Sequence, residues 1–258
     1  MKAVLLAGGF GTRLEKGARL YSHPDYKSKV QEWVIGKSKG LIPIRGKVIV
    51  NYQLEQLLNC GINKQDIYVH SNEVHKKQYL SWADTNGIPR ENVFSNGVRS
   101  NSEKLEQVKD MILAIQNVGT SSPLLMLACD TLVYNENNKV HCFKKMIQDY
   151  HQDQKSRVVV YKKDHNLSKH GIVQTDREGN VIGFEEKPEN PKSNLVNASI
   201  YLYHPAKLQE ILDEKVELSK IKNPLQVIWP NFKIEIADKR VDIGCIEDVL
   251  ISNNIPFS

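Results

Sequence analysis

Long apolar runs and paired cysteines are both missing from this chain of 258 residues. No segment approaches the roughly 20 consecutive apolar residues that span a membrane, and the apolar run that begins at Met1 is too short for a signal peptide. The four cysteines form no CxxC pair and no zinc-type spacing. They are Cys60, Cys129, Cys142 and Cys245. We therefore predict a cytoplasmic protein with reduced thiols and no membrane partner.

Internal repeats, low-complexity tracts and Pro/Gly/Ser-rich linkers are also absent from the sequence. Hydrophobic residues make up 40% and charged residues 25%, which excludes disordered and collagen-like classes. The 35 Lys and Arg residues exceed the 30 Asp and Glu residues and give a net charge of +5. This mild excess suits a phosphorylated small molecule as well as nucleic acid. The whole chain, residues 1–258, is predicted to be a single domain.

The first 150 residues alternate between apolar strand-like runs and helical patterns. Residues 2–6 are typical of a buried parallel strand, residues 51–60 of a helix, and residues 66–70 of the next strand. A second helix is expected near residues 73–84, and a third at Ser100, where Ser100 and Glu103 could form a capping box. This alternation predicts a parallel sheet covered by helices.

The pattern changes after Lys155, where several short β-rich segments follow one another. A tight-turn sequence at residues 176–180 separates two of them, which favours antiparallel or mixed pairing. A helix from Pro205, two further strands and a last helix near Ile246 complete the expected elements. The fold class is therefore α/β, with a mixed sheet.

One segment does not fit this alternation. Between Leu14 and Lys37 the chain is basic and aromatic with little periodicity, and it is long for a connection between a strand and a helix. We expect an irregular loop here, either a lid over the substrate or a plain surface excursion.

A glycine cluster directly follows the first predicted strand. Gly8, Gly9 and Gly11 allow a tight turn whose free N–H groups can face a phosphate or a base, and Arg13 adds a planar cation. The dinucleotide fingerprint needs a further glycine where Leu14 stands, and the P-loop needs Gly-Lys-Ser/Thr, so neither motif matches. The cluster indicates a nucleotide site, with a purely structural turn as the alternative.

Five segments, in order, resemble the sugar-1-phosphate nucleotidyltransferases, also called nucleotide-sugar pyrophosphorylases. They are GGFGTRL, the segment KGLIPIRGKV that starts at Lys39, LLMLACD with Asp130, the GFEEKP and VNASIYLY strands, and VDIGCIEDV with Asp242. The matches extend from residue 1 to about residue 250. The resemblance implies a Rossmann-like three-layer α/β/α fold around a mainly parallel mixed sheet. It also implies a nucleotide-binding part at about 1–135 and a sugar-phosphate-binding part at about 136–258.

The family pattern further implies roles for individual residues. Nucleotide binding falls to Ala7, Gly8, Gly9, Gly11, Thr12 and Arg13. The cations expected at the reacting phosphates are Arg13, Lys39 and Lys187. Binding of the sugar phosphate falls to Gly171, Glu186, Lys187 and Asn197. Taken singly, each of these could be a surface charge, a strand-edge amide or a bulge glycine.

Asp130 and Asp242 each stand at the end of an apolar strand, which is where open α/β sheets bind ligands. Such a pair of carboxylates can hold one Mg²⁺, and the resemblance implies that metal as the cofactor. Each aspartate alone could instead cap a turn or a helix. No protein nucleophile is required, because the attacking phosphate oxygen is already ionised at neutral pH.

The sequence departs from the family pattern in two places. Gly40 stands where relatives usually carry proline, and the distance from Arg13 to Lys39 is longer than usual, so Lys37 competes for the role of the signature lysine. Residues 92–102 lack the motifs by which many relatives read the base. The identities of the base and of the sugar therefore stay open.

The leading hypothesis is a Mg²⁺-dependent enzyme that condenses a nucleoside triphosphate with a sugar 1-phosphate and releases pyrophosphate. Two alternatives remain: transfer to a non-sugar phosphate, as in cytidylyltransferases, and a catalytically idle regulatory subunit that binds nucleotide-sugars. The predicted partners are the two small-molecule substrates and further copies of the chain in a homo-oligomer, without nucleic acid.

Overall fold

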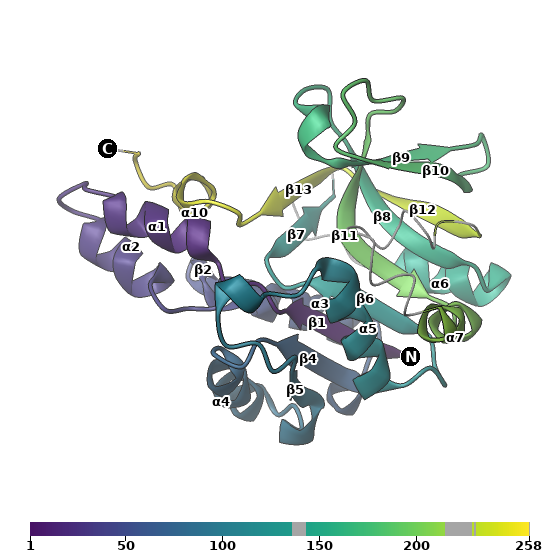
Figure 1. Cartoon of the computed structure of the whole chain (residues 1–258), viewed down its shortest axis with the longest axis horizontal. Helices are drawn as coiled ribbons and strands as arrows, with labels where there is room; N and C mark the ends of the chain where they lie inside the picture. The colour runs from purple at the N-terminus through teal and green to yellow at the C-terminus, as the bar shows by residue number, and fades with distance from the viewer. Residues whose placement is uncertain (136–142, 215–228, 230, 258) are drawn as a thin grey trace.

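The structure, a computed structural model, describes residues 1–135, 143–214, 229 and 231–257. Within these residues nine strands form one central sheet, and two strand pairs lie beside it (Figure 1). The sheet contains β1 (Lys2–Ala7), β4 (Ile67–Ser71), β5 (Val93–Ser95), β6 (Leu124–Ala128), β8 (Ser156–Lys162), β9 (Gly171–Thr175), β10 (Val181–Glu186), β11 (Leu195–Tyr203) and β12 (Phe232–Ala237). The pairs are β2 (Pro43–Ile44) with β3 (Lys47–Val48), and β7 (Thr131–Tyr134) with β13 (Lys239–Asp242).

The helices alternate with the strands over the first half of the chain, as the sequence predicts. The α-helices of the whole described part of the chain are α1 (Thr12–Leu20), α2 (Lys27–Val34), α3 (Ile49–Asn59), α4 (Lys76–Asn86), α5 (Gln107–Val118), α6 (Lys144–Asp153), α7 (Pro205–Asp213) and α10 (Ile246–Ser252). The helical pattern of residues 140–152 predicts a helix whose first residues, Cys142 among them, lie outside the described residues. No helix in the described part of the chain is both long and apolar enough to cross a membrane.

The first half of the sheet is parallel. β1 lies between β4 and β6, with Leu5 opposite both Val69 and Leu127, and β5 extends the sheet beyond β4. These strands are almost continuously apolar and buried, as expected for parallel strands covered on both faces. Their carboxyl ends therefore meet at one edge of the sheet.

The second half is largely antiparallel, as predicted for the region after Lys155. β11 joins the two halves, because Ile200–Tyr203 pair with β6 while Leu195 and Val196 pair with β9. Between these segments the pairing of β11 with β8 shifts register, and Ser199 takes a positive φ of 59°. The prediction of an α/β fold around a mixed sheet is confirmed.

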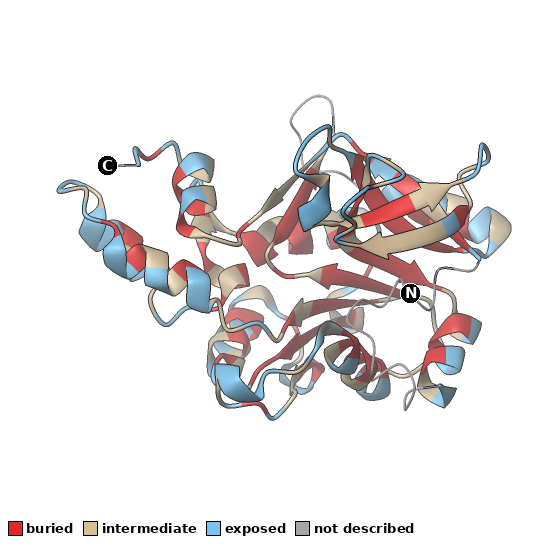
Figure 2. Ribbon diagram, turned by 45° about the horizontal axis from the view of Figure 1, so that its top comes forward, coloured by how far each residue is buried: buried red, intermediate tan, exposed pale blue. Residues whose placement is uncertain are grey.

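Buried side chains form separate clusters on the two faces of the sheet. One face packs against α3, α4 and α6, through residues such as Leu57, Tyr79 and Met146. The other packs against α5 and α7, through residues such as Met111 and Leu208. Figure 2 shows the strands largely buried between helices whose outer surfaces are exposed. The molecule thus has the expected three layers.

The prediction of an irregular loop between Leu14 and Lys37 was wrong, because this segment forms α1 and α2. Leu14 and Ala18 on α1, together with Val30 and Val34 on α2, bury a narrow stripe against α10 in a third apolar cluster. The stripe has only two buried residues per helix, too few to produce a clear helical period. Figure 1 shows α1 and α10, from opposite ends of the chain, side by side.

The helix expected to begin at Ser100 was also misplaced. Asn101–Glu103 form a single 3₁₀ turn without a side-chain cap, and α5 begins only at Gln107. Ser100 instead lies within hydrogen-bond distance of Ser102, at 2.9 Å between the hydroxyl oxygens. The connection between β5 and α5 is therefore longer than predicted and borders the cavity described below.

Candidate active site

The glycine turn leaves the carboxyl end of β1, whose last residue is Ala7, and runs into α1 at Thr12. Gly11 caps that helix with a φ of 67°, a conformation that glycine adopts without strain. The buried Asn72, directly after β4, donates hydrogen bonds from Nδ2 to the carbonyl oxygens of Gly8 and Gly9, at 3.2 and 3.3 Å. These contacts use the carbonyl groups of the turn rather than its N–H groups.

Arg13 lies in the first turn of α1, and its side chain is exposed. Within the described residues it forms no ion pair, unlike Arg19 further along the helix, which contacts Glu15. Thr12 is exposed beside it. The start of α1 therefore presents an uncompensated cation and a hydroxyl at the end of β1, where the positive end of the helix dipole also favours an anion.

The side chain of Lys39 reaches Asp130, which lies just after the end of β6. Its Nζ lies 2.9 Å from Oδ2 of Asp130, and both side chains are largely buried. Burial alone would lower the pKa of Lys39, but the charge and hydrogen bond of Asp130, aided by Asp242, outweigh it and raise the pKa. The ammonium group is therefore held in its charged form.

The two candidate signature lysines lie in different places. Lys37 lines a separate hollow with Lys77 and Trp82 of α4, whereas Lys39 faces Asp130. A Cβ on Gly40 would lie 2.7 Å from Oη of Tyr79 and equally close to Val50. Gly40 thus lets the backbone that carries Lys39 pack directly onto the core, in a space where a proline ring has no room.

Asp130 and Asp242 lie on two neighbouring segments of the chain. The N–H of Ile243 donates to the carbonyl of Asp130 at 3.0 Å, and Asp242 pairs with Thr131 between β13 and β7. Partial burial and the nearby charge of Asp130 raise the pKa of Asp242. Asp242 does not cap α10, because Asp248 accepts the N–H groups of Gly244 and Cys245, both at 2.8 Å.

This carboxylate pair fits a divalent cation. The oxygens are hard ligands, and Asp130 lies close enough to Asp242 that its charge, after burial, helps to raise the pKa of Asp242. In the part of the chain that the structure describes, no cluster of three or more His, Cys, Asp or Glu residues could hold a metal. Mg²⁺ commonly takes one or two protein carboxylates and completes its shell with water and substrate phosphates, so two ligands suffice.

Two further polar residues position this region, and the sequence analysis missed both. Gln53 on α3 is buried and donates from Nε2 to the carbonyls of Ala128 and Thr131, each at 2.8 Å, which fixes the turn that carries Asp130. Arg240 on β13 lies 3.1 Å from both Asp242 Oδ1 and Thr131 Oγ1. Neither residue belongs to a motif, and the contacts of Gln53, like that of Arg240 with Thr131, join positions far apart in the sequence.

Three of the four expected sugar-phosphate residues, Gly171, Glu186 and Lys187, lie on or next to the β9–β10 hairpin. Glu186 pairs with Gly171, and a Cβ on Gly171 would lie 3.0 Å from Oε2 of Glu186 and closer still to Phe184. Lys187 has a positive φ of 51° and an exposed side chain, with its Nζ 3.8 Å from Glu186 Oε1. The hairpin therefore carries a carboxylate and a largely free cation next to each other.

Asn197 lies on β11, at the change of register. Its Nδ2 donates to Tyr201 Oη at 2.7 Å, and its Oδ1 accepts the N–H of Ser199 at 2.9 Å, so its side chain also holds the irregular part of the strand. Burial and the nearby charge of Glu186 raise the pKa of Tyr201 to about 12. The expected contact of Asn197 with a sugar stays a prediction.

Lys163 and His170 form a pair next to the start of β9. Nζ of Lys163 is 3.0 Å from Nε2 of His170, whose pKa is lowered to about 4 by burial and by the charges of Lys163 and Arg240. The neutral ring of His170 accepts a hydrogen bond from the Lys163 ammonium group and carries no charge of its own. The positive potential on this side of the site therefore comes from lysine and arginine.

A cavity of about 230 Å³ lies beside the glycine turn. Its lining comes from β1 and the glycine turn after it, from the end of β6, from the segment between β5 and α5, from α5 and from the irregular part of β11. The lining polar and glycine residues are Gly8, Gly9, Asn96, Lys104, Asp110 and Ser199. The cavity thus adjoins the region to which the resemblance assigns the nucleotide.

Comparison with known proteins agrees with this geometry. The profile of the nucleotidyl transferase family matches residues 35–247. The chain belongs to the nucleotidyl transferase family. The match includes Lys39, Asp130, Asp242 and the β9–β10 hairpin, and the resemblance seen in the sequence is confirmed.

Among its relatives in this family are two proteins named mannose-1-phosphate guanylyltransferase catalytic subunit beta. That of Drosophila pseudoobscura pseudoobscura is 27% identical over 255 residues, with 96% of this chain and 60% of the relative aligned. That of Drosophila melanogaster is 28% identical, with 96% and 61% aligned. The chain therefore spans about 60% of the length of these relatives.

Solved structures show the same fold. An apo UDP-glucose pyrophosphorylase superposes with a TM-score of 0.67 at 18% identity, covering 98% of this chain and 97% of the other. A UDP-glucose pyrophosphorylase from Acinetobacter baumannii gives 0.65 at 18% identity, covering 97% and 91%. At this identity the likeness establishes the nucleotidyl transferase architecture alone.

Proposed function

We propose that this protein condenses a nucleoside triphosphate with a sugar 1-phosphate to form a nucleotide-sugar and pyrophosphate. The observation that carries the proposal is the contact of Lys39 with Asp130, next to Asp242, at the edge of the sheet where the glycine turn also ends. A charged lysine beside paired carboxylates, near a glycine turn whose N–H groups are not used by Asn72, suits polyphosphate chemistry. We also keep the predicted cytoplasmic location, where both substrates would be available.

In the proposed reaction a sugar-phosphate oxygen forms a bond to the α-phosphorus of the triphosphate. The bond from that phosphorus to the β-phosphate oxygen breaks, and the electron pair leaves with pyrophosphate. The attacking oxygen is already ionised, so no side chain has to remove a proton. The chain's contribution is to bring two anions together and to hold them in line.

Each cation has a place in this scheme. Arg13, exposed at the start of α1, would bind the β- and γ-phosphates of the triphosphate and follow them as pyrophosphate leaves. Lys39 would contact the α-phosphate as negative charge builds up there. Lys187, exposed on the β9–β10 hairpin, would bind the sugar phosphate, with Glu186 and Asn197 accepting and donating hydrogen bonds to sugar hydroxyls.

Asp130 and Asp242 would hold the Mg²⁺ that we expect as cofactor. When bound, that ion neutralises phosphate charge and orients the triphosphate. Asp130 would also keep Lys39 close to the same phosphates, because its Oδ2 accepts a hydrogen bond from the ammonium group of Lys39.

The test is a matrix of pyrophosphate release. Purified protein with Mg²⁺ is mixed with each common nucleoside triphosphate and with a panel of acceptors that includes mannose 1-phosphate, glucose 1-phosphate and non-sugar phosphates such as choline phosphate. We expect release with at least one triphosphate and a sugar 1-phosphate. Mannose 1-phosphate is the first acceptor to test, because the relatives described above are named mannose-1-phosphate guanylyltransferases.

Two outcomes would replace the proposal. Turnover with a non-sugar phosphate only would indicate a cytidylyltransferase-like enzyme. Tight nucleotide binding without release for any pair would indicate a regulatory subunit. Sedimentation of the same sample gives the oligomeric state, for which we propose a homo-oligomer.

A further inference from the structure

The cavity beside the glycine turn contains a carboxylate that the mechanism above does not use. Asp110 lies in the first turn of α5, with its side chain 15% exposed. Its Oδ1 accepts a hydrogen bond from Nδ2 of Asn96 at 2.8 Å and lies 3.1 Å from Nε2 of the fully buried His70. Because a carboxylate only accepts hydrogen bonds, Nε2 of His70 carries the proton. Three elements, β4, the end of β5 and α5, thus fix the orientation of one side chain.

The other oxygen of Asp110 faces the glycine turn. A Cβ built on Gly8 would lie 2.1 Å from Oδ2, a distance that no side chain could tolerate. Gly8 is therefore glycine here because the carboxylate occupies the space next to its Cα. Within the described residues Oδ2 has no hydrogen-bond donor, and Asp110 and Gly8 line the same cavity.

An oriented carboxylate oxygen beside this turn selects what can enter the cavity. Uracil and thymine present one N–H between two carbonyl oxygens, and both carbonyls would be repelled by the carboxylate. Guanine presents two adjacent donors, N1–H and the 2-amino group, followed by a carbonyl at C6. Lys104 lines the same cavity and supplies a donor for such a carbonyl. Of the common bases, guanine matches this combination of one acceptor and one donor with the most hydrogen bonds.

We propose that Asp110 reads the N1–H and 2-amino groups of guanine, so that the triphosphate used by this protein is GTP. This inference rests on the proposed function and names its nucleotide. Lys104 would donate to the O6 atom of the same base, while His70 and Asn96 act as positioning residues that keep Asp110 in place.

The first test needs no variant. Binding of GTP and of inosine triphosphate, which lacks only the 2-amino group, is measured by calorimetry with the full chain, alongside UTP, CTP and ATP. We expect GTP to bind about 10-fold or more tighter than inosine triphosphate and about 100-fold tighter than UTP. Equal binding of GTP and inosine triphosphate, or preference for UTP or CTP, would overturn the proposal.

The second test compares Asp110→Asn with Lys109→Ala, an exposed neighbour on the same helix. Asp110→Asn should reduce the preference for GTP over UTP by about 10- to 100-fold and abolish the difference between GTP and inosine triphosphate. Lys109→Ala should retain both. Unchanged GTP selectivity in a folded Asp110→Asn protein would rule out the assignment.

The failure of this inference and that of the proposed function are distinguishable. Pyrophosphate release with UTP and a sugar 1-phosphate would overturn the guanine assignment and leave the proposed reaction intact. Absence of turnover with every pair would overturn the proposed reaction, and the binding comparison of GTP with inosine triphosphate would still decide the role of Asp110.

Discussion

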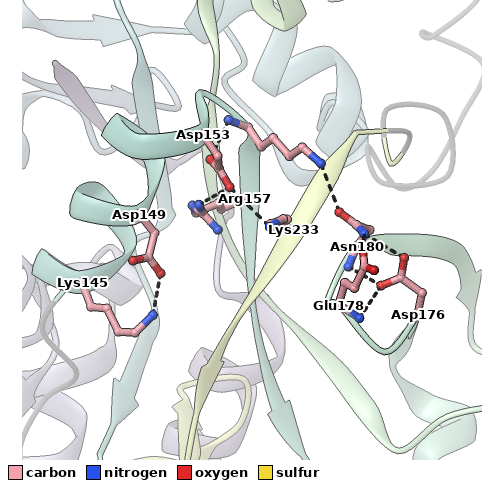
Figure 3. A network of polar contacts seen from close by, with 9 residues as sticks. Lys145, Asp149, Asp153, Arg157, Asp176, Glu178, Asn180 and Lys233 are labelled. Atoms are coloured by element: carbon pink, nitrogen blue, oxygen red, sulfur yellow. Dashed lines mark hydrogen bonds and ion pairs between the residues drawn. The ribbon is translucent and has the colours of Figure 1, made fainter.

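Two polar clusters of this molecule use similar residues to opposite effect. One is the active-site pair, Asp130 and Asp242 with Lys39 and Arg240. The other is a distal cluster, shown in Figure 3, where α6, β8, β12 and the β9–β10 turn meet. There Asp153 accepts from Arg157 Nη2 at 2.8 Å and lies 3.5 Å from Lys233 Nζ.

The pKa values of Asp153 and Asp176 in the distal cluster shift in the opposite direction to that of Asp242 in the active site. Burial would raise the pKa of Asp153, but the N–H of Lys155 and the charge of Arg157 outweigh it, so the pKa is lowered. Asp176 in the nearby turn accepts two backbone N–H groups and the side chain of Asn180, which also lower its pKa. Asp242 has a raised pKa instead.

We interpret this difference as one between a structural role and a binding role. In the distal cluster the donors around Asp153 and Asp176 stabilise the ionised carboxylates. In the active site, burial and the charge of Asp130 disfavour the ionised form of Asp242, and a bound cation would stabilise that form. Shifted pKa values of this kind are common at binding sites.

The largest effect is expected from the same substitution made in both clusters. Asp130→Asn should reduce pyrophosphate release by about 10³-fold, because it removes a metal ligand and the partner of Lys39. Asp153→Asn should leave turnover within about twofold, since it lies in the distal cluster. Steady-state kinetics with circular dichroism checks both. An active Asp130→Asn enzyme would remove the metal assignment and the comparison with it.

A smaller effect should separate two exposed lysines of one hairpin region. Lys187→Ala should raise the KM for sugar 1-phosphate about 10-fold and leave the KM for the triphosphate almost unchanged, through loss of one charge-assisted contact. Lys192, equally exposed and 3.6 Å from Glu185, is the matched control. Equal changes in both KM values for Lys187→Ala would place this lysine at a different phosphate.

The smallest effect concerns acid stability. Because the folded state lowers the pKa of Asp153 below 3.8, its contribution is present above that pH and is lost as the pH falls through the folded-state value. Asp153→Asn should therefore lower the free energy of unfolding by about 1 kcal/mol or less at pH 6 and by less at pH 3. Urea titrations at the two pH values measure this. A deficit that stays constant would mean that ionisation of Asp153 is not the cause.

The sequence alone predicted much of the fold because the parallel strands are nearly continuous apolar runs and their motifs follow directly. It did not predict α1 and α2, whose buried stripe is too narrow to give a period. Ser100 and Glu103 matched a capping pattern, yet the chain forms only a 3₁₀ turn there. Short polar patterns of this kind occur by chance.

The candidate site was predictable only where a residue belongs to a motif. The motif led to Lys39, but choosing it over Lys37 required the position of Asp130 in space. Asp110, Asn72 and Gln53 carry no local signal, because each acts on an element distant in the sequence. Hydrogen bonds between distant elements follow from the packing of the sheet, which the sequence does not list residue by residue.

Gly40 connects the position of Lys39 to the packing of the core. The space that a side chain would need there is filled by Tyr79, Val50 and Cys129. A variant that carries the proline of the family pattern at this place must therefore also make room among these residues. We expect the effects of substitutions at these four positions to be coupled, because the placement of Lys39 depends on the packing of the helices beneath it.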